Sequence, residues 1–490
     1  MTQSPPVREV RPPIQRTAAR ADLIAAGAAG GLVVAAWAVG SWLTAHGADV
    51  YAPTPPLYAG YAPHVGPGSL PALVLAVLVA LRGPELAARL AWRPLLAVGY
   101  LASVAWTTFL ALVDGWRTGI AGRLTVPTEY LHEVPGVTDI GVLLRTFTTR
   151  ILAFGPHSFT THVAAHPPGA LLVFVGLDRI GLGGGGPAGV LCILVGASTP
   201  VAVALTLRAL GGAPLARAGL PFLVLAPAAV WVGVSADGLF AGVLAWGVAL
   251  LALGAAGRRD GARWVGWSLA GGLLLGGCLY LSYGLVLGGL FPLVVLALTR
   301  RIAPIAVATG AAGAVAGAFT AAGFWWPTGY QLTKILYGQP LQLGTERPYG
   351  YWVWAAPAAL AIAVGPATVA GLRRLVASVP IASGPTALGA AASASAASGP
   401  TVSEPGPTAP AATRDRGLVA LVLLGAAALT AVLLADVSGL SRGEVERIWL
   451  PWAFWLVAAT ALLPGRHASR WLLAQAVVAL AVNHLLVPPW

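Results

Sequence analysis

Several carboxylates of this chain stand where a side chain could take a proton from a bound hydroxyl group. Asp237 lies in the short turn Ser235–Gly238 between two apolar segments, where an ionisable side chain is costly and usually functional; it could also cap the next helix. Asp114 ends an apolar segment, and Glu129 follows in a polar stretch. A positioned carboxylate acts as a general base, although each could equally be a solvated loop carboxylate. The catalytic candidates are Asp114, Glu129 and Asp237, with Glu133 and Asp139 as alternatives.

Arginines in two later polar stretches could bind an anion. Ser441–Trp449 carries Arg442 and Arg447, whose planar guanidinium groups suit two phosphate oxygens, and Glu444 and Glu446 could hold them in place. A surface ion-pair cluster is the alternative. Tyrosines near the second stretch, Glu346–Tyr349, could stack on a sugar-like ring, although aromatic side chains are common at membrane interfaces. The substrate-binding candidates are His166, Tyr283, Arg347, Tyr349, Arg442, Glu444 and Arg447.

The motif His166-Pro167-Pro168-Gly169 precedes an apolar helix. Each proline fixes its own φ angle and favours an extended conformation for the residue before it. Pro168 also suits the first turn of a helix. The motif therefore predicts a rigidly held His166 at the end of a polar loop, or simply a helix start.

The elements that position these residues are membrane helices. The chain is 57% hydrophobic and only 9% charged over 490 residues, whereas a soluble domain needs about a quarter of its residues charged. Apolar runs near 20 residues are long enough to cross a bilayer. The fold class expected is all-α, polytopic, with about 13 transmembrane helices. The expected spans are Leu23–Ala45, Leu70–Leu81, Pro94–Val113, Pro187–Leu207, Leu220–Val234, Gly238–Ala256, Trp264–Leu281, Gly284–Leu298, Ala303–Trp325, Trp352–Ala370, Leu418–Leu434, Trp449–Leu463 and Trp471–Val487.

The charges predict which side each loop faces. With the N-terminus inside, most of the 29 basic residues fall in inner segments, as the positive-inside rule requires. Most of the 17 acids, and every histidine except His467, then fall outside. The reactive groups therefore share the extracytoplasmic face of the plasma membrane. Because the basic residues are scattered through short loops, the net charge of +12 does not indicate nucleic-acid binding.

Four regions follow from this reading. Residues 1–21 are expected to be a cytoplasmic tail, and 22–370 the transmembrane core. The core includes outer loop 114–168, where Asp139–Phe154 has helical apolar spacing and should lie in the membrane interface. A second interfacial helix is expected over Pro168–Ile180, which is too short to cross. Residues 371–416 are rich in Ala, Ser, Pro and Gly and should be disordered, before the final helices in 417–490.

In order and spacing, Asp114–Ala256 resembles the core of GT-C fold glycosyltransferases, in particular the protein mannosyltransferase and aminoarabinose transferase branch. The resemblance rests on His166-Pro-Pro-Gly leading an apolar helix, a membrane helix ending at Arg208, a helix with Pro227, and Asp237 at the outer end of the next helix.

This resemblance implies that a sugar moves from a polyprenyl-phosphate donor to an envelope acceptor, which is a glycan, a lipid or a protein. It also implies that an acid in the first long outer loop is the base, here Asp114 or Glu129. The family often has adjacent acids there, which this chain lacks. A single displacement would invert the anomeric carbon without a second carboxylate acting as nucleophile.

Other classes are less well supported by the residues. The chain has no Walker-type phosphate loop and no His-Glu-x-x-His motif. His157, His162 and His166 lack a convincing metal-ligand pattern, so no metal or other cofactor is expected to be required, and a divalent cation is left open. The alternative functions are a secondary transporter or lipid flippase, and a non-catalytic scaffold. A transporter would need a pathway opening at both faces, whereas an enzyme needs a cavity at one.

Overall fold

Long apolar helices make up most of the protein. The computed structural model describes residues 13–48, 50–153, 155, 157–257, 262–338, 347–382 and 409–488. Within these ranges, eight helices are long and apolar enough to cross a membrane, which confirms an all-α polytopic fold. They are α1 (Pro13–Ala45), α2 (Ser69–Arg89), α3 (Trp92–Ala111) continued by η1 (Leu112–Asp114), α7 with α8 (Gly185–Gly196 and Thr199–Ala209), α11 (Ala236–Ala256), α12 (Arg263–Leu281), α14 (Ile302–Ala321) and α20 (Ala409–Val437).

The other five expected spans are also helical, but they are short, bent or polar. α17 (Tyr349–Val364) and α18 (Pro366–Ala382) meet at an angle of 108° and would make a ninth span only if counted as one. α23 carries the buried polar side chains Gln475 and Asn483. An apolar run thus predicts a buried helix more reliably than it predicts a complete crossing. The three expected spans that are short are α9 (Ala213–Val224), η7 with α13 (Tyr283–Gly289 and Leu290–Thr299) and α22 with η8 (Leu450–Val457 and Ala458–Leu462). The polar helix α23 runs over Ala468–Leu485.

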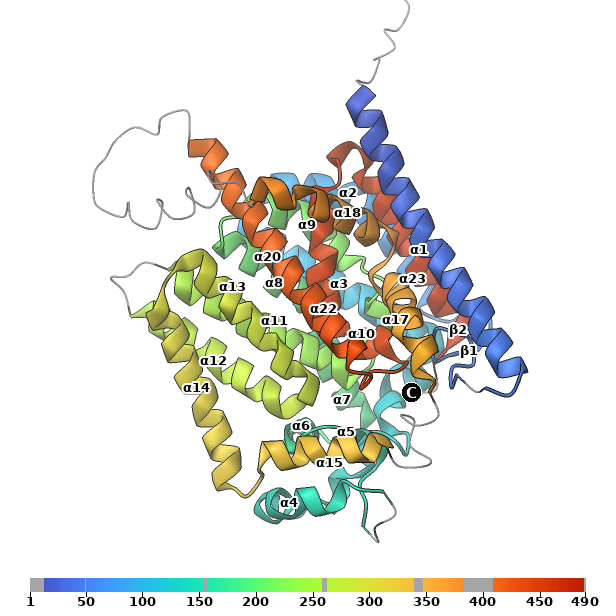
Figure 1. Cartoon of the computed structure of the whole chain (residues 1–490), viewed down its shortest axis with the longest axis vertical. Helices are drawn as coiled ribbons and strands as arrows, with labels where there is room; N and C mark the ends of the chain where they lie inside the picture. The colour runs from blue at the N-terminus through green and yellow to red at the C-terminus, as the bar shows by residue number, and fades with distance from the viewer. Residues whose placement is uncertain are drawn as a thin grey trace, which may run out of the picture.

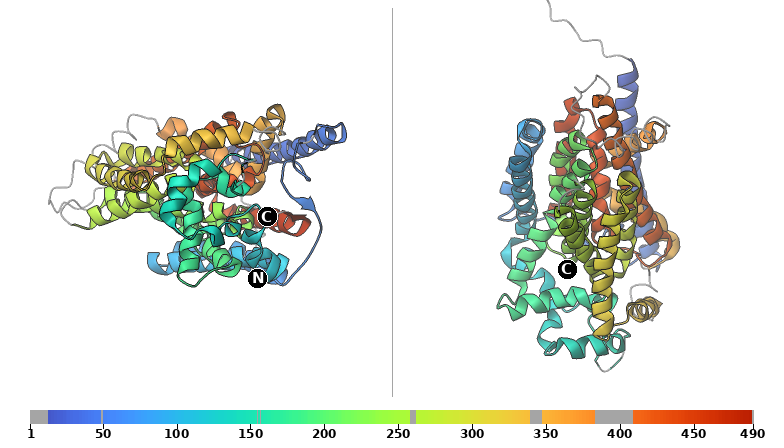
Figure 2. Two further views of the ribbon diagram at one scale, coloured as in Figure 1. Left: turned by 90° about the horizontal axis from the view of Figure 1, so that it is seen from below. Right: turned by 90° about the vertical axis from the view of Figure 1, so that its left-hand side faces the viewer.

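The two ends of the molecule differ in structure. Figure 1 shows the start of α1 and the neighbouring parts of α18 and α20 towards the upper end. The short helices α4 (Ile140–Thr146), α5 (Thr161–Ala165), α6 (Pro168–Arg179) and α15 (Trp326–Gly338) lie at the lower end. The right-hand view in Figure 2 shows the same separation, with the start of α1 above and α4 to α6 below. The loop expected outside is therefore at the opposite end from the start of the chain's first helix.

The outer loop folds as a series of short helical turns. The expected interfacial helix begins as α4, whose first turn is capped by Asp139 accepting from the Val142 backbone nitrogen at 2.8 Å. It continues as η6 (Phe147–Arg150), and its apolar side chains Phe147 and Ile151 are fully buried. Phe154 lies outside the described residues. The other turns are η2 (Trp116–Ala121), η3 (Arg123–Thr125), η4 (Tyr130–His132) and η5 (Val134–Gly136).

Helical structure reaches into the linker expected over 371–416. α18 runs on to Ala382 and α20 starts at Ala409, so the ordered part is longer on both sides than the composition predicts. The buried carboxylate of Asp22 in α1 forms ion pairs with two arginines of α18. Its Oδ2 lies 2.6 Å from Arg374 Nη2 and its Oδ1 lies 3.0 Å from Arg373 Nε, and these pairs hold α18 against α1. Residues 383–408 of the expected linker, and 1–12 of the expected tail, lie outside the described part.

α11 lies at the centre and sets the position of Asp237. It packs against α7, α8 and α12. Glycines permit this approach, since a Cβ at Gly242 would meet the Val195 carbonyl oxygen at 2.3 Å and one at Gly271 would meet the Leu251 nitrogen at 2.8 Å. Away from this centre, the short strand β1 (Gly60–Tyr61) pairs antiparallel with β2 (Leu486–Val487).

Candidate functional site

A cavity of about 390 Å³ lies at the end of the molecule that holds the short helices. Residues from α5, the start of α11, η7, α15 and the segment 438–448 line it. Seven of the sequence-predicted site residues are among them: His166, Asp237, Tyr283, Arg347, Arg442, Glu444 and Arg447. A more open hollow between α1 and residues 51–58 is larger, at about 510 Å³, but no carboxylate, imidazole, lysine or arginine lines it. The smaller cavity is therefore the candidate site.

Asp237 reaches this cavity because another residue caps its helix. The Ser235 hydroxyl accepts from the Gly238 nitrogen at 3.1 Å and is the N-cap of α11. The capping role considered for Asp237 is thus wrong, and its carboxylate is used elsewhere. Asp237 Oδ2 accepts from Arg447 Nη1 at 2.9 Å, across 210 residues of chain.

Arg447 belongs to a row of alternating charges. Its Nη2 donates to Glu444 Oε2 at 2.7 Å, and Arg347 Nη2 donates to Glu444 Oε1 at 2.7 Å. Arg347 also donates to the Arg442 carbonyl, and Arg442 donates to the Arg347 carbonyl at 3.2 Å. Burial acts to raise the pKa of Glu444, but Arg447 and Arg347 outweigh it and lower that pKa to about 2. Glu444 is therefore ionised at neutral pH.

Glu444 stands in an unusual backbone conformation immediately before α21 (Val445–Ile448). Its φ angle is +57°, in the left-handed region that residues with a Cβ rarely adopt. Gly443, next to it, has a φ of +77°, and a Cβ there would come within 3.0 Å of Arg347 Nη1. The tight turn thus brings the Glu444 carboxylate between two arginines, and such conformations are concentrated at functional sites.

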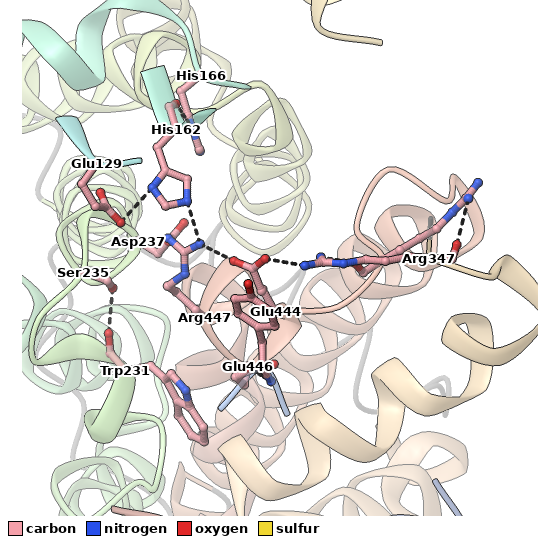
Figure 3. A network of polar contacts seen from close by, with 12 residues as sticks. Glu129, His162, His166, Trp231, Ser235, Asp237, Arg347, Glu444, Glu446 and Arg447 are labelled. Carbon is pink, nitrogen blue, oxygen red and sulfur yellow. Dashed lines mark hydrogen bonds and ion pairs between the residues drawn. The ribbon is translucent and has the colours of Figure 1, made fainter. Parts of the chain in front are cut away.

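The outer loop adds a carboxylate and two imidazoles to the same network (Figure 3). Glu129 is 2% exposed, and its Oε1 lies 2.8 Å from His162 Nδ1. His162 Nε2 lies 3.3 Å from Arg447 Nη2. His166 Nδ1 donates to the His162 carbonyl oxygen at 2.8 Å. Burial acts to raise the pKa of Glu129, but nearby His162 and Arg447 outweigh it and lower that pKa, so Glu129 stays ionised.

Three predicted site residues lie outside the cavity lining: Glu129, which contacts His162, and Asp114 and Tyr349. Asp114 pairs with Arg123, and its Oδ1 lies 2.8 Å from His64 Nε2, in a separate cluster near β1 and β2. The Tyr349 hydroxyl donates to the Val437 carbonyl oxygen at 3.2 Å, and its ring lies 5.4 Å from the Arg442 guanidinium carbon. Tyr349 therefore supports Arg442 from behind instead of facing the cavity.

The alternative acids of the outer loop have structural partners. Glu133 accepts from Arg150 at 3.1 Å and from the Thr160 nitrogen at 2.8 Å, so it fixes the loop that leads to α5. Asp139 caps α4, as described above. Glu346 lies outside the described residues. Glu129 is thus the outer-loop acid that joins the cavity network.

Sequence reasoning missed α15 and the face that it contributes. Trp326 donates to the Leu279 carbonyl oxygen at 2.8 Å and Thr333 to that of Ala164 at 3.3 Å, which holds α15 across the ends of α12 and α5. Its Trp326, Tyr330 and Lys334 line the cavity. The rings of Trp326 and Tyr330 stack with centroids 5.4 Å apart, and Tyr283 lies 5.3 Å from Trp326. The lone lysine of the chain was the available signal.

His162 was also missed as a member of the site, having been considered only as a metal ligand. Its four-residue spacing from His166 is one helical turn, which places both on the same face of α5 and the residue that ends it. In the described part of the chain, no three His, Cys, Asp or Glu side chains are grouped as metal ligands would be.

Comparison with known proteins gives one distant structural similarity. No family model and no curated protein matches the chain. Among solved structures, the crystal structure of the Archaeoglobus fulgidus oligosaccharyltransferase in the apo form is similar, with a TM-score of 0.40 and 13% sequence identity. The match covers 81% of this chain but 56% of that one, so this chain spans little more than half its length. At this distance, function has to be argued from the cavity itself.

Proposed function

We propose that this chain is a membrane glycosyltransferase that moves a sugar from a polyprenyl-phosphate donor to an envelope acceptor on the extracytoplasmic face. The observation that carries the proposal is the meeting, in one cavity, of arginines, carboxylates, imidazoles and aromatic rings. Arginines can bind a phosphate, a carboxylate or an imidazole can take the proton of a hydroxyl group, and aromatic rings can stack on a sugar. Their position at the ends of membrane helices suits a donor that stays in the lipid.

The charge of the cavity lining suits a phosphate. Arg347, Arg442, Arg447 and Lys334 face two carboxylates, which leaves an excess of two positive charges when the histidines are neutral. A phosphate leaving group carries its own negative charge and is stabilised by such donors without a general acid. Arginine can contact two phosphate oxygens at once. Asp237 then has the role of orienting Arg447 towards the phosphate.

Activation of the acceptor depends on the carboxylate of Glu129 in this scheme. It is the outer-loop carboxylate within the network, whereas Asp114, the other candidate, belongs to a separate cluster. We therefore drop Asp114 from the catalytic set. An acceptor hydroxyl is a poor nucleophile, so removing its proton as the new bond forms lowers the barrier.

The aromatic side of the cavity supports binding of a sugar. Tyr283, Trp326 and Tyr330 contact one another and line the cavity together with the charged residues contributed by 442–447. Gly329 makes room for this group, because a Cβ there would meet the Tyr283 hydroxyl at 2.4 Å. Aromatic faces offer the apolar side of a sugar ring a flat surface while its hydroxyls reach the charged residues.

The location of the cavity favours an enzyme over a transporter. The lining residues belong to elements at one end of the helix bundle, including α5 and α15, which lie at the lower end of the molecule in Figure 1. A transporter site is expected near the middle of the membrane, on broken helices related by an internal repeat. The positive-inside rule assigns this end to the extracytoplasmic side.

The test is sugar transfer by the purified chain in liposomes supplied with polyprenyl-phosphate-linked sugars. Glu129→Gln should lower kcat by about a hundredfold or more, as expected when general-base catalysis is impaired. Asp237→Asn should chiefly raise KM for the donor, because Arg447 loses its orienting partner. Asp178→Asn, an exposed carboxylate on α6, is the matched control and should transfer normally. Full transfer by both Glu129→Gln and Asp237→Asn would refute the scheme, and absence of transfer by the wild type from every such donor would refute the function.

A further inference from the structure

Glu129 is separated from the cavity by His162. Its carboxylate is 2% exposed and is not part of the cavity lining, whereas His162 is. The two are joined at the backbone as well, since the His162 nitrogen donates to the Thr128 carbonyl oxygen at 3.0 Å. Any proton that Glu129 helps to remove from a molecule in the cavity must therefore pass through the imidazole.

The contacts of His162 determine which ring nitrogen carries the proton. A guanidinium only donates hydrogen bonds, so the contact of Arg447 Nη2 with His162 Nε2 at 3.3 Å places the proton of the neutral ring on Nδ1, and the negative charge of Glu129 Oε1, 2.8 Å from Nδ1, favours the same tautomer. In the neutral ring, Nε2 then has a lone pair. An N–H of Arg447 lies 3.3 Å from it, in the direction of the cavity. This is the tautomer that can accept a proton at Nε2.

The ring is also held firmly in place. Tyr130 is 1% exposed, and the centroid of its ring lies 6.3 Å from that of the His162 ring and 5.9 Å from that of the His166 ring. His166 Nδ1 donates a hydrogen bond to the His162 carbonyl oxygen at the end of α5. Together with the Glu129 contact, these interactions leave the His162 ring little freedom to turn.

We propose that His162 is the catalytic base of the transfer and that Glu129 is a positioning residue that acts through it. This inference rests on the proposed function. The acceptor oxygen forms its bond to the anomeric carbon of the donor. The bond from that carbon to the phosphate oxygen breaks, and its electron pair stays on the phosphate. The proton of the acceptor hydroxyl moves to His162 Nε2, and the imidazolium is stabilised by the Glu129 carboxylate.

The surrounding charges favour this proton transfer. His162 and Arg447 share three carboxylates, Glu129, Asp237 and Glu444. Once the donor phosphate takes the Arg447 guanidinium as a partner, the N–H that points at Nε2 is drawn towards the phosphate. The Nε2 lone pair is then open to the acceptor hydroxyl. His166 and Tyr130 are the other titratable groups that face the ring.

Transfer kinetics of His162→Asn, Glu129→Gln and the double variant test this assignment, with exposed His132→Asn as the control. His162→Asn should lower kcat roughly a hundredfold or more with little change in the donor KM. Glu129→Gln should slow the wild type but not the His162→Asn variant further, because the two act as one unit. Independent, multiplicative losses, or a loss confined to KM, would overturn the inference while leaving the proposed function intact.

The pH profile gives a readout that a purely structural role would not change. The rate should rise with pH as His162 loses its proton. That rise should move to lower pH in Glu129→Gln, because an imidazolium there lacks its carboxylate, and it should vanish in His162→Asn. Added imidazole should restore part of the rate to His162→Gly. A rise that persists in His162→Asn and vanishes in Asp237→Asn would assign the base to Asp237 instead.

One measurement does not depend on activity. Nitrogen NMR of ¹⁵N-histidine-labelled protein, with His162→Asn to assign the signal, should find His162 protonated at Nδ1 in the neutral ring. Glu129→Gln should weaken that preference, because a neutral amide oxygen is a poorer acceptor than a carboxylate. A neutral His162 protonated at Nε2 would overturn the inference even if sugar transfer is observed, and absence of transfer with the expected tautomer would count against the proposed function alone.

Discussion

Replacement of Arg447 by glutamine should destabilise the protein strongly. Arg447 is 4% exposed and contacts Asp237 at 2.9 Å and Glu444 at 2.7 Å. Glutamine can still donate a hydrogen bond, but it has no charge. Glu444 would keep Arg347, whereas Asp237 would lose the cation with which it pairs. The buried carboxylate of Asp237 would then be left uncompensated.

The size of the effect follows from this contrast. Removing one partner of a buried ion pair costs about 3–5 kcal/mol. Because Glu444 keeps a partner, we expect Arg447→Gln to fall near the lower end, at about 3 kcal/mol. Adding Asp237→Asn removes the uncompensated charge and should recover about 1–2 kcal/mol of that loss.

The measurement is reversible unfolding in detergent micelles titrated with sodium dodecyl sulfate and followed by tryptophan fluorescence. Arg89→Gln is the control, since Arg89 pairs with Glu85 at 2.8 Å on an exposed surface, where such pairs contribute about 0–1 kcal/mol. If Arg447→Gln is no more destabilising than Arg89→Gln, or if Asp237→Asn adds to its effect, the network does not have the energetic role inferred from its geometry.

Three further changes test other parts of the structure. Burial, and then the negative charge of Glu444, raises the pKa of Glu446 from 4.5 to about 7. Between these two pH values the folded protein binds more protons than the unfolded chain, so the free energy of unfolding falls as pH rises through them. Glu446→Gln should remove this pH dependence and should be more stable than the wild type at pH 8 in denaturation titrations. Asp22→Asn leaves two arginines without their shared carboxylate and should cost on the order of 2 kcal/mol, since these arginines are partly solvated; an unchanged thermal midpoint would contradict it. Gly272→Ala should lower the thermal midpoint, because its Cβ would meet the Ala308 carbonyl oxygen at 2.2 Å, whereas Gly277→Ala, with open space around it, should not.

Local features of this fold could be predicted because they depend on neighbouring residues. The two prolines predicted that a helix begins at Pro168 after an extended His166, and α6 starts there with His166 at φ −125° and ψ 157°. Apolar spacing predicted the buried side of α4 and η6. The apolar runs predicted the helices themselves, but not which ones bend or stop short, because that depends on what each packs against.

The site could be predicted only in part, since its contacts join distant segments. The glutamates of Ser441–Trp449 were predicted to hold its arginines. Glu444 does contact Arg447, whereas Glu446 accepts from the Tyr58 nitrogen at 3.2 Å instead. The pairing of Arg447 with Asp237 could not be derived, because spacing along the chain contains no information about contacts between helices. α15 was missed for another reason: Gln331 and Lys334 interrupt its apolar pattern.

The wide sequence separation within the Glu129, Asp237 and Arg447 network has a consequence for biosynthesis. Membrane helices enter the bilayer in order as the ribosome makes them, so Glu129 and Asp237 are inserted long before Arg447 emerges. Until the last helices arrive, these acids have no guanidinium to neutralise them, and the nascent chain has no working centre. A chain truncated before Arg447 would keep most of its hydrophobic helices but expose buried acids, which would make it a substrate for membrane proteases instead of an enzyme with partial activity.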